Sequence, residues 1–196
     1  MTRPLLRQTE LAVAADDALF AQLASGDLAP LGELFDRHHA AIRQFVLRLL
    51  LDPAEVDDVV QDTFLTASRA AGSFAPGAAA KPFLFGIAAQ LVRRRRRGFA
   101  RLRRLLGALG QQAGEPPPSA MDQLVAEERT AAVHAALAKL SDRHREVLVM
   151  VELGGMSGVE VSRALGVPAG TVWRRLSEAR TELARRLVVS GGRQGL

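Results

Sequence analysis

Apolar residues recur every three or four positions along most of the chain, which is the spacing of a helix with one buried side. Runs of β-branched residues are few, and Leu, Ala and Arg dominate the sequence. The pattern therefore predicts an all-α fold. We expect helices over residues 16–24, 30–50, 52–70, 82–97, 121–140, 142–153, 157–166 and 168–187.

The stretch 157–187 carries the clearest pair of helices. Ser157, with Glu160 three residues later, forms a capping-box pattern, and Gly166 suits the left-handed residue that ends a helix. The longer second helix has one apolar stripe, made of Val172, Leu176, Ala179, Leu183 and Leu187. A short helix, a tight turn and a longer basic helix predict a helix-turn-helix, whose second helix enters the major groove of DNA.

The polar side of this second helix is basic. At about 100° per residue, the positions facing away from the stripe are Arg174, Ser177, Thr181 and Arg185, flanked by Trp173, Arg175 and Arg180. This composition favours contact with DNA bases and phosphates. An ordinary helical hairpin with a solvated Arg face is the alternative that the stretch leaves open.

The predicted helix over 52–70 has two contrasting sides. Asp52 is its expected N-cap and Pro53 its first residue. The core side is predicted to hold Val56, Val60, Phe64 and Ala67, and the opposite side Asp57, Asp58, Gln61 and Asp62 around Leu65. An apolar residue inside a charged rim indicates a protein-binding site. A solvated acidic face with one stray exposed Leu fits the spacing equally well.

Gly and Pro predict a loop over residues 72–80, and the helix that follows carries a polar strip. The strip consists of Gly86, Gln90, Arg93 and Arg97, with Phe83 at its edge. An aromatic ring can stack on a base, an amide can bond to a base edge, and Arg neutralises phosphate. The strip therefore suits nucleic acid.

Positive charge is concentrated at the end of this helix. Arg93–Arg97 with Arg101, Arg103 and Arg104 place eight positive charges in twelve residues, with no acid among them. A solvated basic helix end, favoured by the helix dipole, is the alternative to a nucleic-acid site. Eight charges exceed what the dipole needs, so the clustering favours nucleic acid.

A Gly-, Gln- and Pro-rich segment over residues 107–120 predicts a flexible linker between two small helical domains. The expected order is a flexible N-terminus (1–15), a first domain (16–106), the linker, a second domain (121–190) and a flexible tail (191–196). Fully extended, the linker spans at most about 45–50 Å. One turn of B-DNA is about 34–36 Å, so two DNA-binding domains on this tether could occupy separate sites.

Composition narrows the possible partners and compartment. The net charge is +5 and the pI about 11, which suggests a polyanionic partner. The sequence has no Cys, which excludes disulfides, thiolate metal sites and Cys nucleophiles and fits a reducing cytoplasm. The sequence shows no signal-peptide apolar region and no membrane span, so we expect a cytoplasmic protein without membrane insertion.

These pieces, in this order, resemble the extracytoplasmic-function (ECF) class of the sigma-70 family of bacterial RNA polymerase sigma factors. The stretch DDVVQDTFLTA resembles the part of sigma region 2 that docks on a coiled coil of the polymerase β′ subunit. The stretch PFLFGIAAQLVRRRRR resembles the part that opens the promoter and contacts the −10 element. Residues 140–183 resemble region 4, which contacts the −35 element and the polymerase β flap.

The resemblance implies roles for particular residues. Core-polymerase contacts would come from Asp58, Gln61, Asp62 and Leu65. Contacts to the −10 element would come from Ser73, Phe74, Lys81, Phe83, Gly86, Gln90, Arg93, Arg94 and Arg97, with the 72–80 loop capturing a flipped base. Contacts to the −35 element would come from Thr171, Trp173, Arg174, Arg175, Ser177 and Arg180. An anti-sigma factor is a further implied partner, and no cofactor is implied.

The chain departs from the family's usual pattern at several of these positions. The family usually has Trp where Phe83 stands and commonly Asn where Gln90 stands, and the all-Arg segment commonly contains an acid. Phe83 keeps a stacking surface. Trp173 stands where a small basic or polar residue is common, and Pro168, where Ser is frequent, cannot supply a side-chain cap.

Two other function classes can be weighed against a sigma factor. A stand-alone helix-turn-helix regulator would bind duplex DNA without polymerase, but it leaves the acidic face around Leu65 and the 82–97 strip without a role. An enzyme has little support, because the sequence has no P-loop and no nucleophile elbow. The four histidines, His38, His39, His134 and His144, show no metal-ligand spacing with carboxylates.

Overall fold

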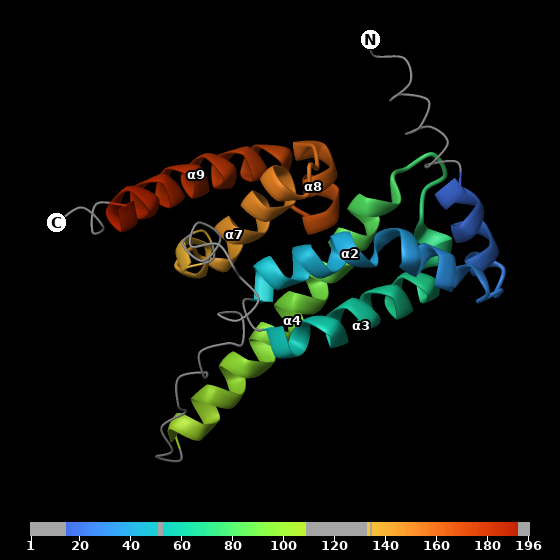
Figure 1. Ribbon diagram of the computed structural model, residues 1–196, viewed down its shortest axis with the longest axis horizontal. Coiled ribbons are helices and arrows are strands. Elements are labelled where there is room, and N and C mark those ends of the chain that lie inside the picture. The colour runs from blue at the N-terminus through green and yellow to red at the C-terminus, as the bar shows by residue number, and fades with distance from the viewer. Residues whose placement is uncertain (1–14, 51–52, 109–132, 134, 192–196) are drawn as a thin grey trace, which may run out of the picture.

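The computed structural model describes residues 15–50, 53–108, 133, 135–191, and the described residues are helical with short connections (Figure 1). A helix over residues 15–24 comes first. The remaining elements are α2 (Pro30–Leu50), a 3-10 turn η1 (Pro53–Glu55), α3 (Val56–Arg69), a 3-10 turn η2 (Ala71–Ser73), α4 (Ala80–Ala108), α7 (Asp142–Leu148), a π-helical turn η3 (Val149–Leu153), α8 (Gly158–Leu165) and α9 (Ala169–Gly191). The expected all-α class is confirmed.

The first lobe is built from the N-terminal helix, α2, α3 and α4. Each of α2, α3 and α4 packs against the other two, as helices with one apolar side do. The expected core side of α3 is confirmed, with Val56, Val60, Phe64 and Ala67 all buried. Phe35 of α2 lies at the edge of the core, 37% exposed, against Phe64.

α4 is longer than the sequence pattern suggested. It begins at Ala80 and continues to Ala108, so its last two residues fall in the segment predicted as linker. The second half of α4 extends away from the other helices of the lobe (Figure 1). The Asp52 cap, the rest of the predicted linker and the predicted helix up to residue 132 lie outside the described residues.

The second lobe contains the predicted helix-turn-helix. Both bonds of the capping box are present at the start of α8: the Glu160 backbone N–H donates to the Ser157 hydroxyl, and the Ser157 backbone N–H donates to the Glu160 carboxylate. Gly166 ends α8 in the left-handed region, at φ 64° and ψ 36°. The stripe on α9 is buried at Val172, Leu176 and Ala179, which pack on α7 and α8.

The two lobes pack against each other. α8 lies along α4, and η3 and α7 contact α2, so the buried residues of both lobes form one continuous core. Phe85 of α4 lies at this junction, stacked on Phe45 with ring centroids 4.1 Å apart. A Cβ built on Gly154 would approach the Phe85 ring to 2.9 Å, so the junction is closely packed.

Candidate functional site

The acidic face of α3 is the first candidate surface, made of Asp58, Gln61, Asp62 and Leu65. All four residues are exposed, with Leu65 38% accessible. Arg95 of α4 reaches this face, with its guanidinium 3.3 Å from Asp62 and 3.7 Å from Asp58. The sequence pattern did not indicate this pairing, because Arg95 belongs to a run of five arginines that all looked alike. The leucine stays accessible beside a partly neutralised acidic rim.

The 72–80 loop is exposed at its tip and anchored at both ends. Residues 75–77 are exposed, whereas Phe74 is buried at 8% accessibility and Phe83, in the first turns of α4, is half-buried. Phe74 and Phe83 meet edge to face with centroids 5.3 Å apart. The Lys81 ammonium lies 5.3 Å above the Phe85 ring, and Ser73 bonds to the Ala70 carbonyl.

The α4 strip is not one open surface, which corrects the expectation from helical spacing. Gln90, Arg94 and Arg97 are exposed as expected. Gly86 is instead buried, and a Cβ built there would come within 3.2 Å of the Ala164 Cβ on α8. Arg93 donates to Glu146 of α7 at 2.8 Å. The physical reason is the second lobe, which covers these two positions.

Charged groups at the junction of the lobes are held by specific bonds. Burial raises the pKa of Glu146, although its bond with Arg93 acts in the opposite direction. Arg145 is buried and donates to the carbonyls of Leu137, Ala138, Leu140 and Leu49. Burial and the nearby Arg96 charge lower the pKa of Arg145 to about 10. Arg145 remains charged at neutral pH and ties α7 to the end of α2.

The α9 face is made of Thr171, Trp173, Arg174, Arg175, Ser177 and Arg180. Arg174 is the most accessible of its ion-paired arginines, with 69% of its side chain exposed and Glu178 3.7 Å away. Arg180 is tied to Glu152 by a 2.8 Å bond. Trp173 is 53% exposed, and one edge of its ring lies on Gly158 at the start of α8. The face is open, unlike the covered part of the α4 strip.

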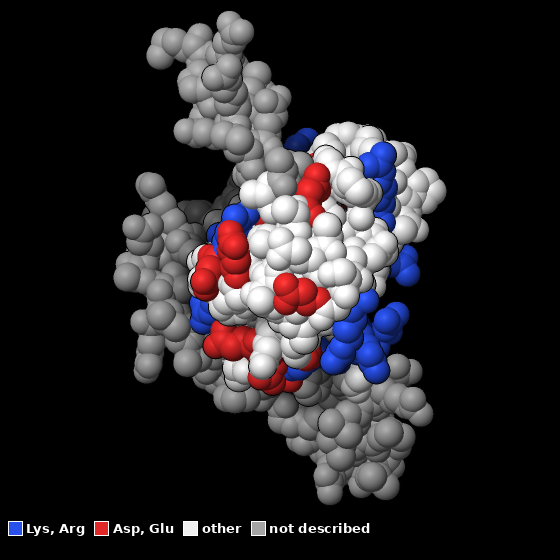
Figure 2. All heavy atoms as spheres, turned by 90° about the vertical axis from the view of Figure 1, so that its right-hand side faces the viewer, with Lys and Arg blue, Asp and Glu red and all other residues white. Residues whose placement is uncertain are grey.

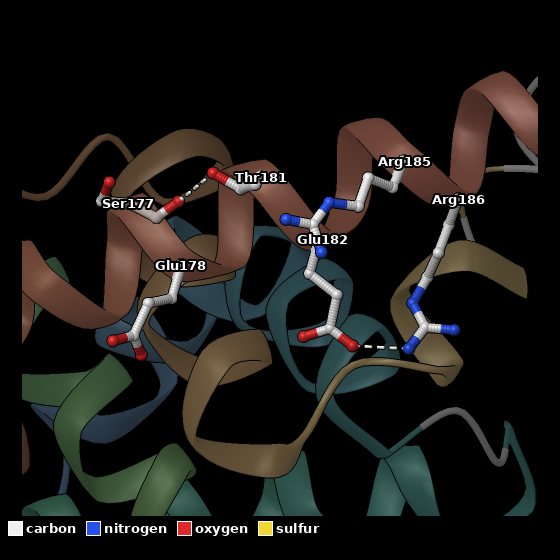
Figure 3. Close-up of a pocket in the computed structure, with 6 residues that line it drawn as sticks. All are labelled: Ser177, Glu178, Thr181, Glu182, Arg185 and Arg186. Atoms are coloured by element: carbon white, nitrogen blue, oxygen red, sulfur yellow. Dashed lines mark hydrogen bonds and ion pairs between the residues drawn. The ribbon is translucent and has the colours of Figure 1, made fainter.

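A further cluster of charges lies beside the α9 face and was missed by sequence reasoning. His144 of α7 lies between Glu178 and Glu182, 3.1 Å from each carboxylate. Bonds from Arg186 and His144 lower the pKa of Glu182. Figure 3 shows Glu182 and Arg186 joined along α9, with Ser177 and Thr181 one turn apart. The i, i+4 spacing on α9 was visible in the sequence, but the packing of His144 was not.

The described part of the chain offers neither a metal-binding cluster nor a membrane-spanning helix. No group of three or more His, Asp or Glu side chains there is arranged to hold a metal ion. No helix among the described residues is long and apolar enough to cross a membrane.

Family models of known proteins match both lobes of the chain. Residues 34–102 match the family model of sigma-70 region 2, and residues 130–183 match that of sigma-70 region 4. The chain belongs to the ECF class of the sigma-70 family. The sigma factor CnrH of Cupriavidus metallidurans is 36% identical over 179 residues, covering 87% of this chain and 93% of CnrH. The ECF sigma factor SigM of Mycobacterium tuberculosis is 33% identical over 173 residues, covering 88% of this chain and 85% of SigM.

Solved structures of sigma factors share the fold. CnrH in complex with the cytosolic domain of CnrY matches with a TM-score of 0.66 at 30% identity, covering 89% of this chain and 98% of that one. The sigma factor RpoE of Bartonella quintana, in complex with the anti-sigma factor NepR, also gives 0.66, at 25% identity, covering 81% and 96%.

Proposed function

We propose that this ECF sigma factor binds core RNA polymerase, contacts the −10 and −35 promoter elements and helps to open promoter DNA. The observation that carries the proposal is the joint presence of an exposed leucine in an acidic face on one lobe and an exposed basic helix-turn-helix face on the other. A regulator that only bound duplex DNA would need the second surface but not the first.

The acidic face of α3 is the proposed contact with the polymerase β′ coiled coil. Leu65 supplies an apolar anchor, and Asp58, Gln61 and Asp62 supply the polar rim that is typical of protein interfaces. Arg95 already holds two of these carboxylates, so a basic partner would compete with it. The positions of the Asp58 and Asp62 carboxylates therefore depend on where α4 holds Arg95.

Promoter contacts are proposed at α4 with the 72–80 loop, and at α9. Gln90, Arg94 and Arg97 are accessible for strand contact, and Arg174 and Arg175 for contact in the major groove. Opening the DNA requires no covalent chemistry. It requires a site that offsets the loss of base stacking with stacking and hydrogen bonds to an extruded base. We therefore propose a non-enzymatic initiation subunit.

The closed arrangement of the lobes bears on this proposal. Gly86 lies against Ala164, and Arg93 is bonded to Glu146. Gly86 cannot contact DNA while α8 covers it, and Arg93, with 31% of its side chain exposed, is held by Glu146. The proposed −10 contact at Gly86 therefore requires the second lobe to move away from α4, and full use of Arg93 requires it to leave Glu146.

An anti-sigma factor is the proposed regulatory partner, and the cytoplasm the proposed compartment. The solved RpoE structure contains the anti-sigma factor NepR. Similarity to that sigma factor over most of both chains supports a comparable partner here. A polymerase subunit works where the genome is transcribed, which supports the cytoplasm.

Run-off transcription with purified core polymerase tests the proposed function. Wild-type protein should direct transcripts from a matched promoter, and a variant with Asp62→Arg and Leu65→Ala should lose co-purification with core. The control, Asp36→Arg with Leu28→Ala, makes the same types of change at exposed positions outside the acidic face of α3. Tight duplex binding without any core-dependent transcript would contradict the proposal and favour the stand-alone regulator.

A further inference from the structure

The tip of the 72–80 loop is held by a residue far away in the sequence. The Gly77 backbone N–H donates to Asp17 Oδ2 in the N-terminal helix at 2.8 Å, across 60 positions. Gly77 has φ +76°, a left-handed conformation that a glycine adopts without strain. Residues 75–77 are otherwise exposed, so this bond is a long-range attachment of the tip.

The same helix also packs against the two ends of the loop. Phe20 is buried and stacks on Phe74, with centroids 4.0 Å apart and planes inclined by 19°. Phe83 meets Phe20 edge to face at 5.4 Å. One helix therefore contacts the residue before the loop tip, the tip itself and the first turns of α4.

The N-terminal helix is in turn fixed to α2. Asp16 is 6% exposed and bonds to Arg37 at 3.1 Å and to His38 at 3.0 Å. Two consecutive aspartates thus have different partners, since Asp16 joins the helix to α2 and Asp17 joins it to the loop. Figure 2 views the molecule from the side on which this helix lies, with acidic side chains grouped on that face and Lys and Arg on its flanks.

We propose that Asp17 is a positioning residue for promoter opening, which holds the 72–80 loop in the shape that receives an unpaired −10 base. The inference rests on the proposed function of that loop. Asp17 acts through Gly77 and does not itself touch DNA. Its second oxygen, Oδ1, is buried without a hydrogen-bond partner among the described residues. A buried acceptor without a partner costs free energy, so stability alone does not account for a carboxylate at this position.

Asp17→Ala tests the proposal in the full-length chain. We expect backbone hydrogen exchange in the peptide spanning residues 74–80 to become faster, because the bond to Gly77 is lost. Promoter opening with core polymerase, followed by permanganate reactivity of unpaired thymines, should slow about five- to tenfold, the factor for one lost hydrogen bond. Core binding and −35 duplex binding should not change.

Two further variants separate positioning from a general loss of structure. Asp17→Asn keeps an acceptor oxygen for Gly77 and should restore most of the opening rate. Asp27→Ala removes another aspartate of the same lobe, whose carboxylate accepts a local bond from the Ala29 N–H at 2.9 Å, and should leave loop exchange and opening unchanged.

The outcomes distinguish the possible failures. Unchanged loop exchange in Asp17→Ala would overturn the proposed attachment, and faster exchange with a wild-type opening rate would overturn the positioning role. Equal slowing by Asp27→Ala would also overturn it, because the effect would then belong to the whole region. Failure of the wild-type protein to open any promoter would instead contradict the proposed function, and the exchange result would still report on the attachment.

Discussion

The two proposed DNA-binding surfaces differ in accessibility. On α9, Arg174 and Trp173 are more than half exposed. On α4, Gly86 is buried under α8 and Arg93 is bonded to Glu146, so the second lobe engages two positions of the strip. Gln90 and Arg97 are exposed, and Arg93 is only partly exposed. The closed structure can therefore present its −35 face but only part of its −10 strip.

The difference between the two surfaces has a local cause. α4 has apolar residues around most of its circumference. Part of this surface packs against α2 and α3, and the part with Gly86 and Phe85 packs against the second lobe. α9 has one apolar stripe, already used against α7 and α8. A helix with one apolar side keeps its polar face free, whereas a helix that is apolar nearly all round recruits a further partner.

A disulfide that locks the lobes should have the largest effect on the two surfaces. Gly86→Cys with Ala164→Cys makes the two Cβ atoms face each other across the lobes, since a built Gly86 Cβ is 3.2 Å from the Ala164 Cβ. Disulfides favour a Cβ separation of about 3.5–4.5 Å, so α8 must shift outward by a few tenths of an ångström for the bond to form. In the oxidised protein, promoter opening should fall at least about 100-fold, because the open form is removed. Duplex binding by α9 should remain, as measured by gel shift.

Two controls accompany the variant with the disulfide between positions 86 and 164. The natural chain has no Cys, so each single-Cys variant under the same oxidant reports on side effects of oxidation. Reduction of the double variant should restore opening, because the substitutions are then present without the covalent bond. An oxidised, fully cross-linked protein that opens promoters at the rate of the reduced one would show that α4 need not be uncovered.

Substitution of Arg174 should give the next largest effect, and only on the exposed surface. If Arg174 makes a bidentate guanine contact, Arg174→Ala should weaken −35 duplex binding by about 1–3 kcal/mol and relax base preference at one position. Arg163→Ala is the matched control, since Arg163 is an exposed arginine on α8 rather than α9. Equal losses in both variants would indicate a general charge effect without a specific contact.

Gln90→Ala should have a smaller effect, on the accessible part of the α4 strip. Gln90 is exposed, so its truncation should not disturb the core, and loss of one hydrogen bond to a base should slow opening about fivefold. Phe83→Ala is a less direct test, because Phe83 packs on Phe20 and Phe74 and its loss would also loosen the loop. Gln44→Ala, an exposed glutamine on α2, should leave the opening rate unchanged.

The sequence predicted elements better than the contacts between distant segments. Helical spacing and the Ser157 capping box correctly predicted the helix-turn-helix, because caps and stripes are local features. Spacing could not predict that Gly86 would be buried, because the angular position of a residue does not say which other helix will cover it. The bonds of Arg95 to α3 and of Asp17 to Gly77 were missed for the same reason, since they join segments 33 and 60 positions apart.

A pH-dependent stability difference at the junction is the smallest predicted effect. Glu146 faces Arg93 and Arg96 of α4 and Asp142 of its own helix, and burial raises its pKa above the ordinary 4.5. The unfolded chain therefore loses this proton more readily than the folded protein, so the contribution of Glu146 to folding falls as pH rises from 4.5 through the raised native pKa.

Glu146→Gln removes this titration. The unfolding free energy of the variant minus that of wild type should therefore become more positive from about pH 4 to about pH 7. Urea titrations at both pH values measure the change. Glu152→Gln is the matched control, because Glu152 also pairs with an arginine but lies on the surface of the second lobe. The same pH profile in both variants would contradict burial as the cause. If only Glu146→Gln gains unfolding free energy, the Glu146 carboxylate destabilises the junction of the two lobes near neutral pH. That destabilisation favours separation of the lobes.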